Sequence, residues 1–191
     1  MSETEDQRIF KGMTPEQIDA LLSRPGPAEA EENRRRLRKA SSLVGLPIEE
    51  WPKFEALWDL SDAGQRFAFD GMTKAEFDKH YPIGLSIYFV EVVELDSKLC
   101  AFNRRTPAEV WGVGIDAKAA GVMLDWIEGR AVTPPAVTRT KCTDEICLLG
   151  GNHRLAVARS MGEISIPILV DPDHFEFIAD SLAIYSKWPR H

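Results

Sequence analysis

Two glycines followed by three polar residues, at positions 150–154, form the stretch of this sequence best suited to chemistry. An apolar run at 146–149 precedes them, and residues 155–161 have the composition of a short helix. The order strand, tight turn, helix is typical of anion sites, because the first backbone N–H groups of a helix have no acceptor within it. Gly150 and Gly151 lack a Cβ atom, so a phosphate could approach the backbone closely there.

The polar residues of this stretch include two basic side chains. His153 carries a titratable imidazole, and Arg154 carries a permanent planar cation. We therefore expect Gly150, Gly151 and Asn152 to bind a phosphate or nucleotide. His153 would orient or deprotonate water, or donate a proton to the leaving oxygen, and Arg154 would neutralise charge, so both are expected to be catalytic. The alternative is an ordinary strand-to-helix turn in which Asn152 caps the helix.

Length and composition limit the other classes of function. With 191 residues, of which 44% are hydrophobic, the chain suits one domain or one domain with an appended segment. Its net charge of −7, from 23 basic and 30 acidic residues, disfavours broad nonspecific DNA binding. A local basic pocket remains compatible with that charge.

Cysteine usage and hydropathy predict a cytoplasmic protein. The three cysteines, Cys100, Cys142 and Cys147, are odd in number and lack a CxxC spacing, which argues against a disulfide framework and against a zinc site. Reduced thiols in the cytosol are the simple interpretation. No apolar run is long enough to span a membrane, and the acidic N-terminus does not resemble a signal sequence.

The chain divides into two regions that differ in their expected secondary structure. Residues 1–83 are expected to be mainly helical and residues 84–191 to mix helices and strands, which predicts an α+β fold with a helical N-terminal region. The basic run at 34–39 is interpreted as a solvated helix face, with a DNA-contacting or partner-contacting helix as the alternative. Helices are expected at 14–24, 28–44, 51–60, 73–80, 116–128, 155–161 and 175–185, and strands at 85–93, 132–140, 146–149 and 164–170. Capping boxes are expected at 73–76 and at 106–109, where the second opens a further short helix, and Gly162 is expected to end the helix at 155–161.

Four motifs in the second region follow the order found in the ParB/sulfiredoxin superfamily. They are Asp116-Ala117-Lys118 in a helix, Pro134-Pro135 at the entry to a strand, the stretch at 150–154, and Ile166-Pro167-Ile168-Leu169-Val170 in a strand. Residues 84–172, a little under half of the chain, therefore resemble this superfamily. The resemblance implies a ParB/sulfiredoxin-like domain over 84–191, and it is more specific for the fold than for the activity.

The resemblance also implies roles for further basic residues. Lys118 matches a lysine that reaches the phosphate pocket in sulfiredoxins. Arg104 and Arg105 resemble part of an Asn-x-Arg element of ParB-like proteins, so these residues too are expected to bind phosphate. Asn152 stands where sulfiredoxins have their catalytic cysteine, which argues against sulfinic acid reduction. The short stretch after residue 172 argues against centromere binding of the partition type.

A free-standing chain of this fold with a helical N-terminal extension is similar to the plasmid fertility-inhibition, or oncogenic-suppression, proteins. This resemblance implies an ATPase with DNase activity that inhibits conjugative or T-DNA-type transfer and meets a component of the transfer apparatus. ATP or another nucleoside triphosphate, accompanied by magnesium, would be the cofactor. The metal ligands are not identified, and the candidate carboxylates are Glu91, Glu94, Asp96, Asp144 and Glu145.

Two other classes of function stay open. A ParB-like regulatory module would bind CTP or ATP without turnover and act through a protein partner. A scaffold would instead contact a partner through the helix that carries 34–39 or through the apolar stripe of Trp51 and Trp58, although such a stripe is more often core packing.

Overall fold

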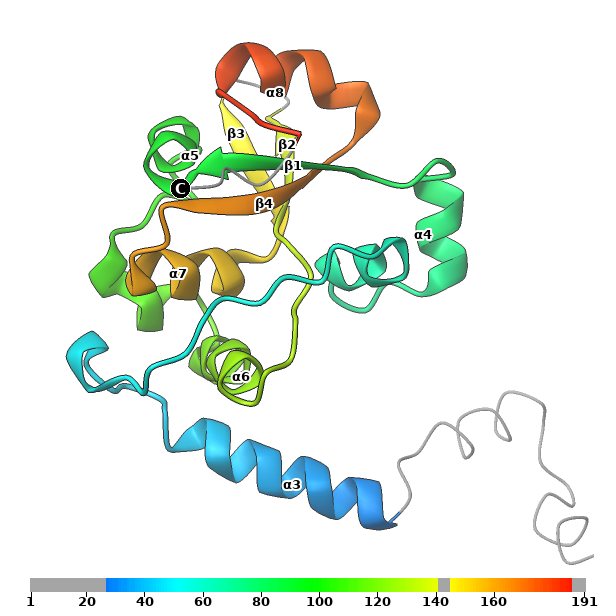
Figure 1. The fold of residues 1–191 in the computed structure, drawn as a ribbon. Coiled ribbons are helices and arrows are strands. Elements are labelled where there is room, and N and C mark those ends of the chain that lie inside the picture. The colour runs from blue at the N-terminus through cyan, green and yellow to red at the C-terminus, as the bar shows by residue number, and fades with distance from the viewer. Residues whose placement is uncertain (1–26, 141–144, 187–191) are drawn as a thin grey trace, which may run out of the picture. The chain divides into compact units, whose positions relative to one another are not determined.

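The structure, a computed structural model, describes residues 27–140 and 145–186 (Figure 1). The chain forms two compact units, residues 1–39 and residues 40–191. The sheet lies in the unit of residues 40–191. The domain boundary near residue 83 that the sequence suggested stays a prediction. The helix expected at 14–24 lies outside the described residues.

The helix α3 (Pro27–Ser41) confirms the helix expected at 28–44 and carries its own ion pairs. Arg34 and Arg38 lie 2.7 and 3.1 Å from carboxylate oxygens of Glu31. Arg35 lies 2.6 Å from Glu32. Pairs of this spacing are favourable on an exposed helix surface. They support the interpretation of the basic run as a solvated face, because three of its five basic side chains are exposed and pair with acidic residues of the same helix.

A four-stranded mixed sheet forms the centre of the second unit, and the α+β class is confirmed. The strands are β1 (Ser86–Glu91), β2 (Ala136–Arg139), β3 (Ile146–Gly150) and β4 (Ser165–Val170), in the spatial order β1-β4-β2-β3. β4 is antiparallel to β1 and parallel to β2, and β2 is antiparallel to β3. The candidate phosphate stretch therefore begins on β3, at one edge of this sheet.

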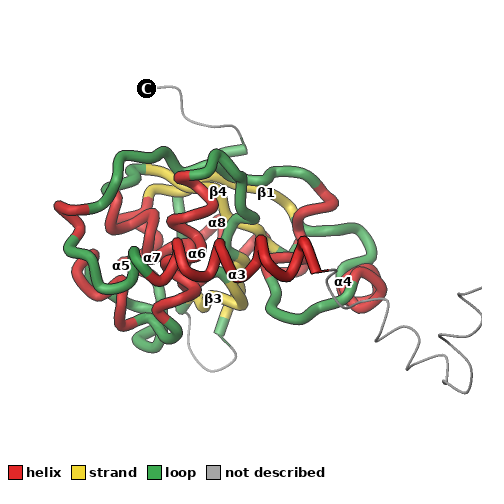
Figure 2. The backbone as a smooth tube through the Cα atoms, turned by 90° about the horizontal axis from the view of Figure 1, so that it is seen from below, coloured by secondary structure: helices red, strands yellow, loops and turns green. Residues whose placement is uncertain are grey.

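Helices cover both faces of the sheet. Figure 1 shows α6 and α7 on one side of the sheet and α8 on the other, and Figure 2 shows the side of α6 and α7 from below. The α-helices of this unit are α4 (Lys74–His80), α5 (Val92–Lys98), α6 (Asp116–Ile127), α7 (Asn152–Met161) and α8 (Phe175–Ser181). The 3₁₀ helices are η1 (Ile48–Glu50), η2 (Asp62–Ala68), η3 (Pro107–Gly112) and η4 (Pro172–His174).

The strand β4 is buried along its whole length because it has a neighbour on each edge and packing on each face. Ile166, Ile168 and Val170 belong to the main hydrophobic core, which also contains Leu155 of α7. Leu169 points into a smaller core on the other side. Burial of each large aliphatic side chain contributes about 1.5–3 kcal/mol, so this strand is a major source of stability.

The helix expected at 51–60 is wrong. Most of this segment is extended, and Trp58 forms a parallel bridge with Val132. Val132 N–H donates to Leu57 O and Asp59 N–H donates to Val132 O, both at 2.9 Å. The backbone bonds to a neighbouring segment therefore replace the helical bonds that the apolar spacing suggested. Pro52 at the start of the segment also has no N–H to contribute to a helix.

The apolar side chains of the same segment still belong to the core, as expected for an apolar stripe that serves core packing. Trp51 packs edge-on against Trp111, and Trp58 packs edge-on against Trp126 of α6. The indole N–H groups of Trp51 and Trp111 both donate to Leu46 O, at 3.1 and 3.0 Å. These aromatic contacts fix the 46–58 segment against η3 and α6.

The strand expected at 85–93 is shorter in the structure than the sequence predicted. β1 ends at Glu91, and the β-branched pair Val92 and Val93 begins α5. Val92 N–H donates to Ile164 O at 2.9 Å, and Val93 is 81% exposed. Tertiary contacts decide the boundary here, since the intrinsic preference of valine is for a strand.

Local capping signals mark several helix ends correctly. Thr73 and Glu76 form the expected capping box at the start of α4, and Thr106 and Glu109 form the one at η3. Gly162 ends α7 in the left-handed conformation. These ends are set by local hydrogen bonds between residues a few positions apart, which a sequence pattern records directly.

Asp96 and Arg159 supply a test of the packing between α5 and α7. Arg159 is almost fully buried and donates to both carboxylate oxygens of Asp96, at 2.7 and 2.5 Å. We expect Asp96→Ala to lower the free energy of unfolding by about 3 kcal/mol, because it leaves a buried cation without its partner. The measurement is urea unfolding followed by circular dichroism.

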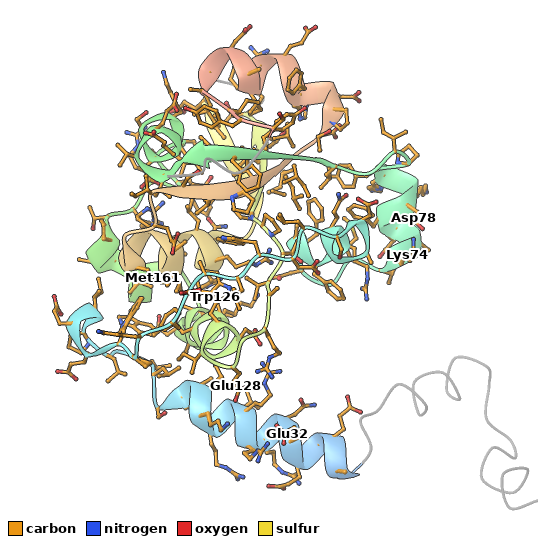
Figure 3. All side chains as sticks on the ribbon, in the orientation of Figure 1. Glu32, Lys74, Asp78, Trp126, Glu128 and Met161 are labelled. Atoms are coloured by element: carbon orange, nitrogen blue, oxygen red, sulfur yellow. The ribbon has the colours of Figure 1, made fainter. Side chains whose placement is uncertain are left out.

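A matched control is the exposed pair of Lys74 and Asp78 on α4, whose charged atoms lie 2.6 Å apart (Figure 3). We expect Asp78→Ala to change the free energy of unfolding by less than about 1 kcal/mol, since exposed pairs contribute little. Equal effects of the two substitutions would contradict a structural role for the buried pair.

Candidate functional site

The end of β3, the start of α7 and one face of α6 line a cavity of about 430 Å³. Its lining residues are Asp70, Lys118, Gly121, Val122, Asp125 and residues 149–154. The structure therefore brings together Lys118 and the whole predicted stretch from Gly150 to Arg154. Arg104 and Arg105 are not among the residues that line this cavity.

The two glycines serve the protein's own packing. A Cβ atom on Gly150 would lie 1.9 Å from the carbonyl oxygen of Ala68. One on Gly151, which has φ +91°, would lie 2.6 Å from Cα of Pro135. The space that their missing side chains leave is thus filled by neighbouring backbone, which corrects the expectation that it admits a phosphate. A ligand can meet this corner only from the cavity side, through backbone N–H groups.

The N-terminus of α7 faces the cavity, but its cap differs from the expected one. Gly151 is the N-cap and Asn152 is the first helical residue, so the alternative in which Asn152 caps the helix is wrong. Leu155 N–H makes a 3.0 Å bond to Gly151 O. The N–H groups of the three residues before Leu155 have no helical acceptor, as at any helix start, and three such groups form an anion-binding arrangement.

The Asn152 side chain is hydrogen-bonded to Asn103, a buried residue of the segment between α5 and η3. Asn103 Nδ2 donates to Asn152 Oδ1 at 2.9 Å. Asn103 Oδ1 accepts from Leu148 N–H of β3 and from the Cys100 thiol, both at 3.1 Å. Asn103 was not predicted as a site residue, although it occupies the Asn position of the Asn-x-Arg element.

Lys118 lies in the cavity as an ion pair with Asp70. Its Nζ donates to a carboxylate oxygen of Asp70. This hydrogen bond holds the pKa of Asp70 below its usual value, against a smaller effect of burial. Both side chains are partly or largely exposed, so solvent or a bound anion can compete for the lysine. Asp70 was not predicted as a site residue, because it follows η2 far from any motif.

Arg154 is engaged by the backbone of its own chain. Its Nη1 donates to Thr133 O at 2.9 Å and to Pro134 O at 3.3 Å, and its Nη2 donates to Phe67 O at 2.8 Å. Burial lowers the pKa of this guanidinium, and the negative charge of Asp70 opposes that shift. Much of the hydrogen-bonding capacity of Arg154 is therefore structural, which corrects the expectation of a free catalytic cation.

His153 lines the cavity, and its Nε2 atom is buried. Within the described residues its Nε2 has no hydrogen-bond partner, and a Cβ atom on the nearby Gly114 would lie 3.5 Å from it. Burial, and next the positive charge of Lys118, lower the pKa of His153 below its usual value. The imidazole is therefore neutral at pH 7 and can accept a proton there.

The two predicted arginines upstream lie elsewhere. Arg104 donates to Leu99 O at 2.7 Å and lies 4.0 Å from Glu145. Arg105 donates to Arg104 O at 2.6 Å and lines a separate hollow of about 90 Å³. The structure therefore does not place these two side chains where the phosphate site was expected.

Of the carboxylates predicted to bind a metal, those that the structure describes do not line the cavity. Glu94 accepts from Ala183 N–H at 2.8 Å, and Asp96 holds Arg159. Asp144 lies outside the described residues. The carboxylates that do line the cavity are Asp70 and Asp125, neither of which was a candidate.

A metal ion would need further oxygen ligands at this cavity. Asp125 accepts from Arg130 Nε at 2.8 Å, so one of its oxygens is already engaged. In the part of the chain that the structure describes, no group of three or more His, Cys, Asp or Glu residues could hold an ion. Magnesium is often bound by one or two carboxylates together with substrate phosphates and water, and Asp70 and Asp125 fit that limited role.

Comparisons with known protein families, with characterised proteins and with solved structures find no match for this chain. Over residues 27–140 and 145–186, no helix is both long enough and apolar enough to cross a membrane.

The packing of the glycine corner predicts a strong asymmetry between two glycines that line the same cavity. Gly150→Ala is expected to lower the free energy of unfolding by about 2 kcal/mol or more, because its Cβ would overlap the Ala68 carbonyl. A Cβ on Gly121 of α6 would meet nothing within 4 Å. Gly121→Ala should therefore be neutral or stabilising by up to about 1 kcal/mol. Urea unfolding of both variants measures this difference, and equal losses would contradict it.

The environment of His153 predicts a pH dependence of stability. The folded state lowers the pKa of this imidazole, so between pH 7 and pH 5 the unfolded chain binds the proton more strongly. The stabilising contribution is complete above the unfolded pKa and is lost as the pH falls through the folded pKa. The free energy of unfolding should fall more steeply with acidification in the wild type than in His153→Gln. Parallel slopes would show that His153 is not the responsible group.

Proposed function

We propose that this chain binds a nucleoside triphosphate through its phosphates at the cavity beside α7, and that it hydrolyses the bound nucleotide. The observation that carries the proposal is the convergence of Lys118 and the first turn of α7 on one cavity of about 430 Å³. This volume lies within the range of small-molecule sites. Helix N-termini and lysine side chains are common partners of phosphate.

The charges of the cavity favour a polyphosphate that carries a metal ion over a free anion. A phosphate that binds Lys118 must displace Asp70, which pairs with the lysine. The released carboxylate would then face the phosphates, and a divalent cation between them would remove the repulsion. Asp70 and Asp125 are the residues that would hold such a cation, which would neutralise phosphate charge when bound.

The hydrolytic part of the proposal depends on His153. A neutral imidazole in the cavity can accept a proton from an attacking water at neutral pH. Lys118 and the N–H groups of α7 would stabilise the negative charge that develops on the phosphoryl oxygens. Arg154 would contribute its charge and hold the corner in place, since its guanidinium already binds three carbonyl groups.

A second candidate is nucleotide binding without turnover, as in a regulatory module that acts through a protein partner. The engagement of Arg154 by Thr133, Pro134 and Phe67 favours it, because the second catalytic residue expected from the sequence has few donors left for a ligand. Phosphate release distinguishes the two candidates directly.

The resemblance to ParB/sulfiredoxin-like fertility-inhibition proteins extends the proposal to DNA. A phosphodiester could occupy the same position as the nucleotide phosphates, and DNA cleavage in the cytoplasm would then block plasmid transfer. The ion pairs within α3 do not support its basic run as the DNA-contacting surface. Nicking of supercoiled plasmid by the purified chain tests this part of the proposal separately.

The binding proposal is tested with two lysine variants. We expect Lys118→Ala to weaken the binding of magnesium-ATP about tenfold or more in calorimetry, because a charge-assisted bond is lost. Lys74→Ala is the control, since Lys74 pairs with Asp78 on α4 and does not line the cavity. Its affinity should stay within about twofold of the wild type. Wild-type protein that binds no nucleotide would overturn the proposal.

Turnover is tested with His153→Gln, which keeps a polar side chain of similar size. We expect the rate of phosphate release to fall by about a hundredfold, with ATP affinity little changed, if the imidazole is a general base. Nucleotide binding by the wild type without phosphate release would establish the regulatory module instead.

A further inference from the structure

Two cysteines that lie far apart in the sequence are in contact in the fold. Cys147 of β3 and Cys100, just after α5, have their sulfur atoms 3.3 Å apart. The backbones are also joined, because Cys100 N–H donates to Ile146 O at 2.8 Å and Leu99 forms a parallel bridge with Ile146. The pair is thus held in contact by the sheet rather than by a chance meeting of mobile side chains.

These thiols begin a chain of hydrogen bonds that ends at α7. Cys147 donates to the Cys100 sulfur, and Cys100 donates to Asn103 Oδ1 at 3.1 Å. Asn103 Nδ2 in turn donates to Asn152 Oδ1 at 2.9 Å. The state of the two sulfur atoms therefore bears on the residue that opens the helix at the cavity.

We propose that Cys100 and Cys147 are a redox-active pair that forms a reversible disulfide, and that this disulfide changes how Asn103 holds Asn152. The oxidant would be a peroxide or a small disulfide. This inference does not rest on the proposed nucleotide hydrolysis, since it concerns only the thiols and the two asparagines.

The geometry requires a small movement. A disulfide bond is about 2.05 Å long, so the sulfur atoms must approach by little more than 1 Å, which side-chain rotation can supply. Oxidation removes the Cys100 S–H group. Asn103 Oδ1 then keeps only the Leu148 N–H as a donor, so one of the bonds that fix the Asn103 side chain against Asn152 is lost.

With hydrogen peroxide the reaction has two steps. The thiolate of Cys147, the less buried of the two, attacks one peroxide oxygen, the O–O bond breaks, and the released hydroxide takes a proton and leaves as water. The Cys100 thiol then attacks the resulting sulfenic sulfur, the S–O bond breaks, and a second water leaves as the S–S bond forms. Two thiols and one peroxide thus give one disulfide and two waters, and a dithiol reductant reverses the oxidation.

The environment makes this pair slow at neutral pH. Burial, followed by the hydrogen bond and charge of Cys100 and then by Glu145, raises the pKa of Cys147 to about 11. The thiolate fraction therefore grows about a hundredfold between pH 7 and pH 9, and the rate of oxidation should follow it. The pair would respond to sustained oxidation rather than to brief exposure.

The test uses the full chain carrying Cys142→Ser, so that the third cysteine cannot form mixed pairs. After hydrogen peroxide treatment, we expect peptide mapping by mass spectrometry to find Cys100 and Cys147 joined, with the loss of two hydrogen atoms and reversal by dithiothreitol. Cys147→Ser in the same background is the control and should yield no internal disulfide. Oxidation that stops at a sulfinic acid on either cysteine would overturn the proposal.

The coupling to Asn152 has its own readout. In nitrogen-15 NMR spectra, the side-chain amide signals of Asn103 and Asn152 should shift on oxidation and return on reduction. The buried amide of Gln65, which donates to Leu85 O at 2.9 Å, is the internal control and should stay in place. A disulfide that leaves both asparagine signals unmoved would overturn the coupling. Equal oxidation rates at pH 7 and pH 9 would overturn the role of Cys147 as the attacking thiol.

Discussion

One guanidinium joins three backbone segments beside the cavity. Arg154, in the first turn of α7, binds carbonyl groups at Phe67, Thr133 and Pro134. The adjoining glycines allow this approach, because Ala68 and Pro135 fill the space where their side chains would be. The end of η2, the entry to β2 and the start of α7 are therefore fixed as one corner. The corner thereby fixes the start of α7, which lines the cavity together with Lys118 of α6.

The corner explains why the electrostatics of the cavity are balanced rather than strongly positive. The guanidinium of Arg154 is buried and bonded to carbonyl groups, and Asp70 forms an ion pair with Lys118. His153 contributes no charge at pH 7, because burial lowers its pKa. A ligand for such a site must itself carry both negative and positive charge. A metal-bound polyphosphate does so, and an isolated anion does not.

The sequence predicted the features that depend on short-range patterns. The α+β class, α6, most of α7, β4 and both capping boxes follow from local periodicity and hydrogen bonding. The segment at 51–60 shows the limit of this approach. Its apolar spacing suits a helix, yet the bridge between Trp58 and Val132 requires an extended backbone, and nothing within the segment records that distant partner.

The same limit applies to the candidate site. The stretch from Gly150 to Arg154 and Lys118 could be recognised from residue types and spacing, and they do share a cavity. Asp70 could not be selected in this way, since it acts through a residue 48 positions away. Asn103 lies in the Asn-x-Arg element, but its role depends on a partner 49 positions away. Residue type also misled where a side chain had two uses, because an arginine that suits phosphate equally suits a cluster of carbonyl oxygens.

The paired indole bonds to Leu46 give the molecule a built-in optical probe. Trp51 and Trp111 meet at one carbonyl, and Trp126 donates to Leu57 O at 2.8 Å. The fluorescence emission of these indoles depends on the polarity around them. It therefore reports whether the 46–58 segment is packed against η3 and α6. Because β1 contains no tryptophan, tryptophan fluorescence reports on this strand less directly than circular dichroism does.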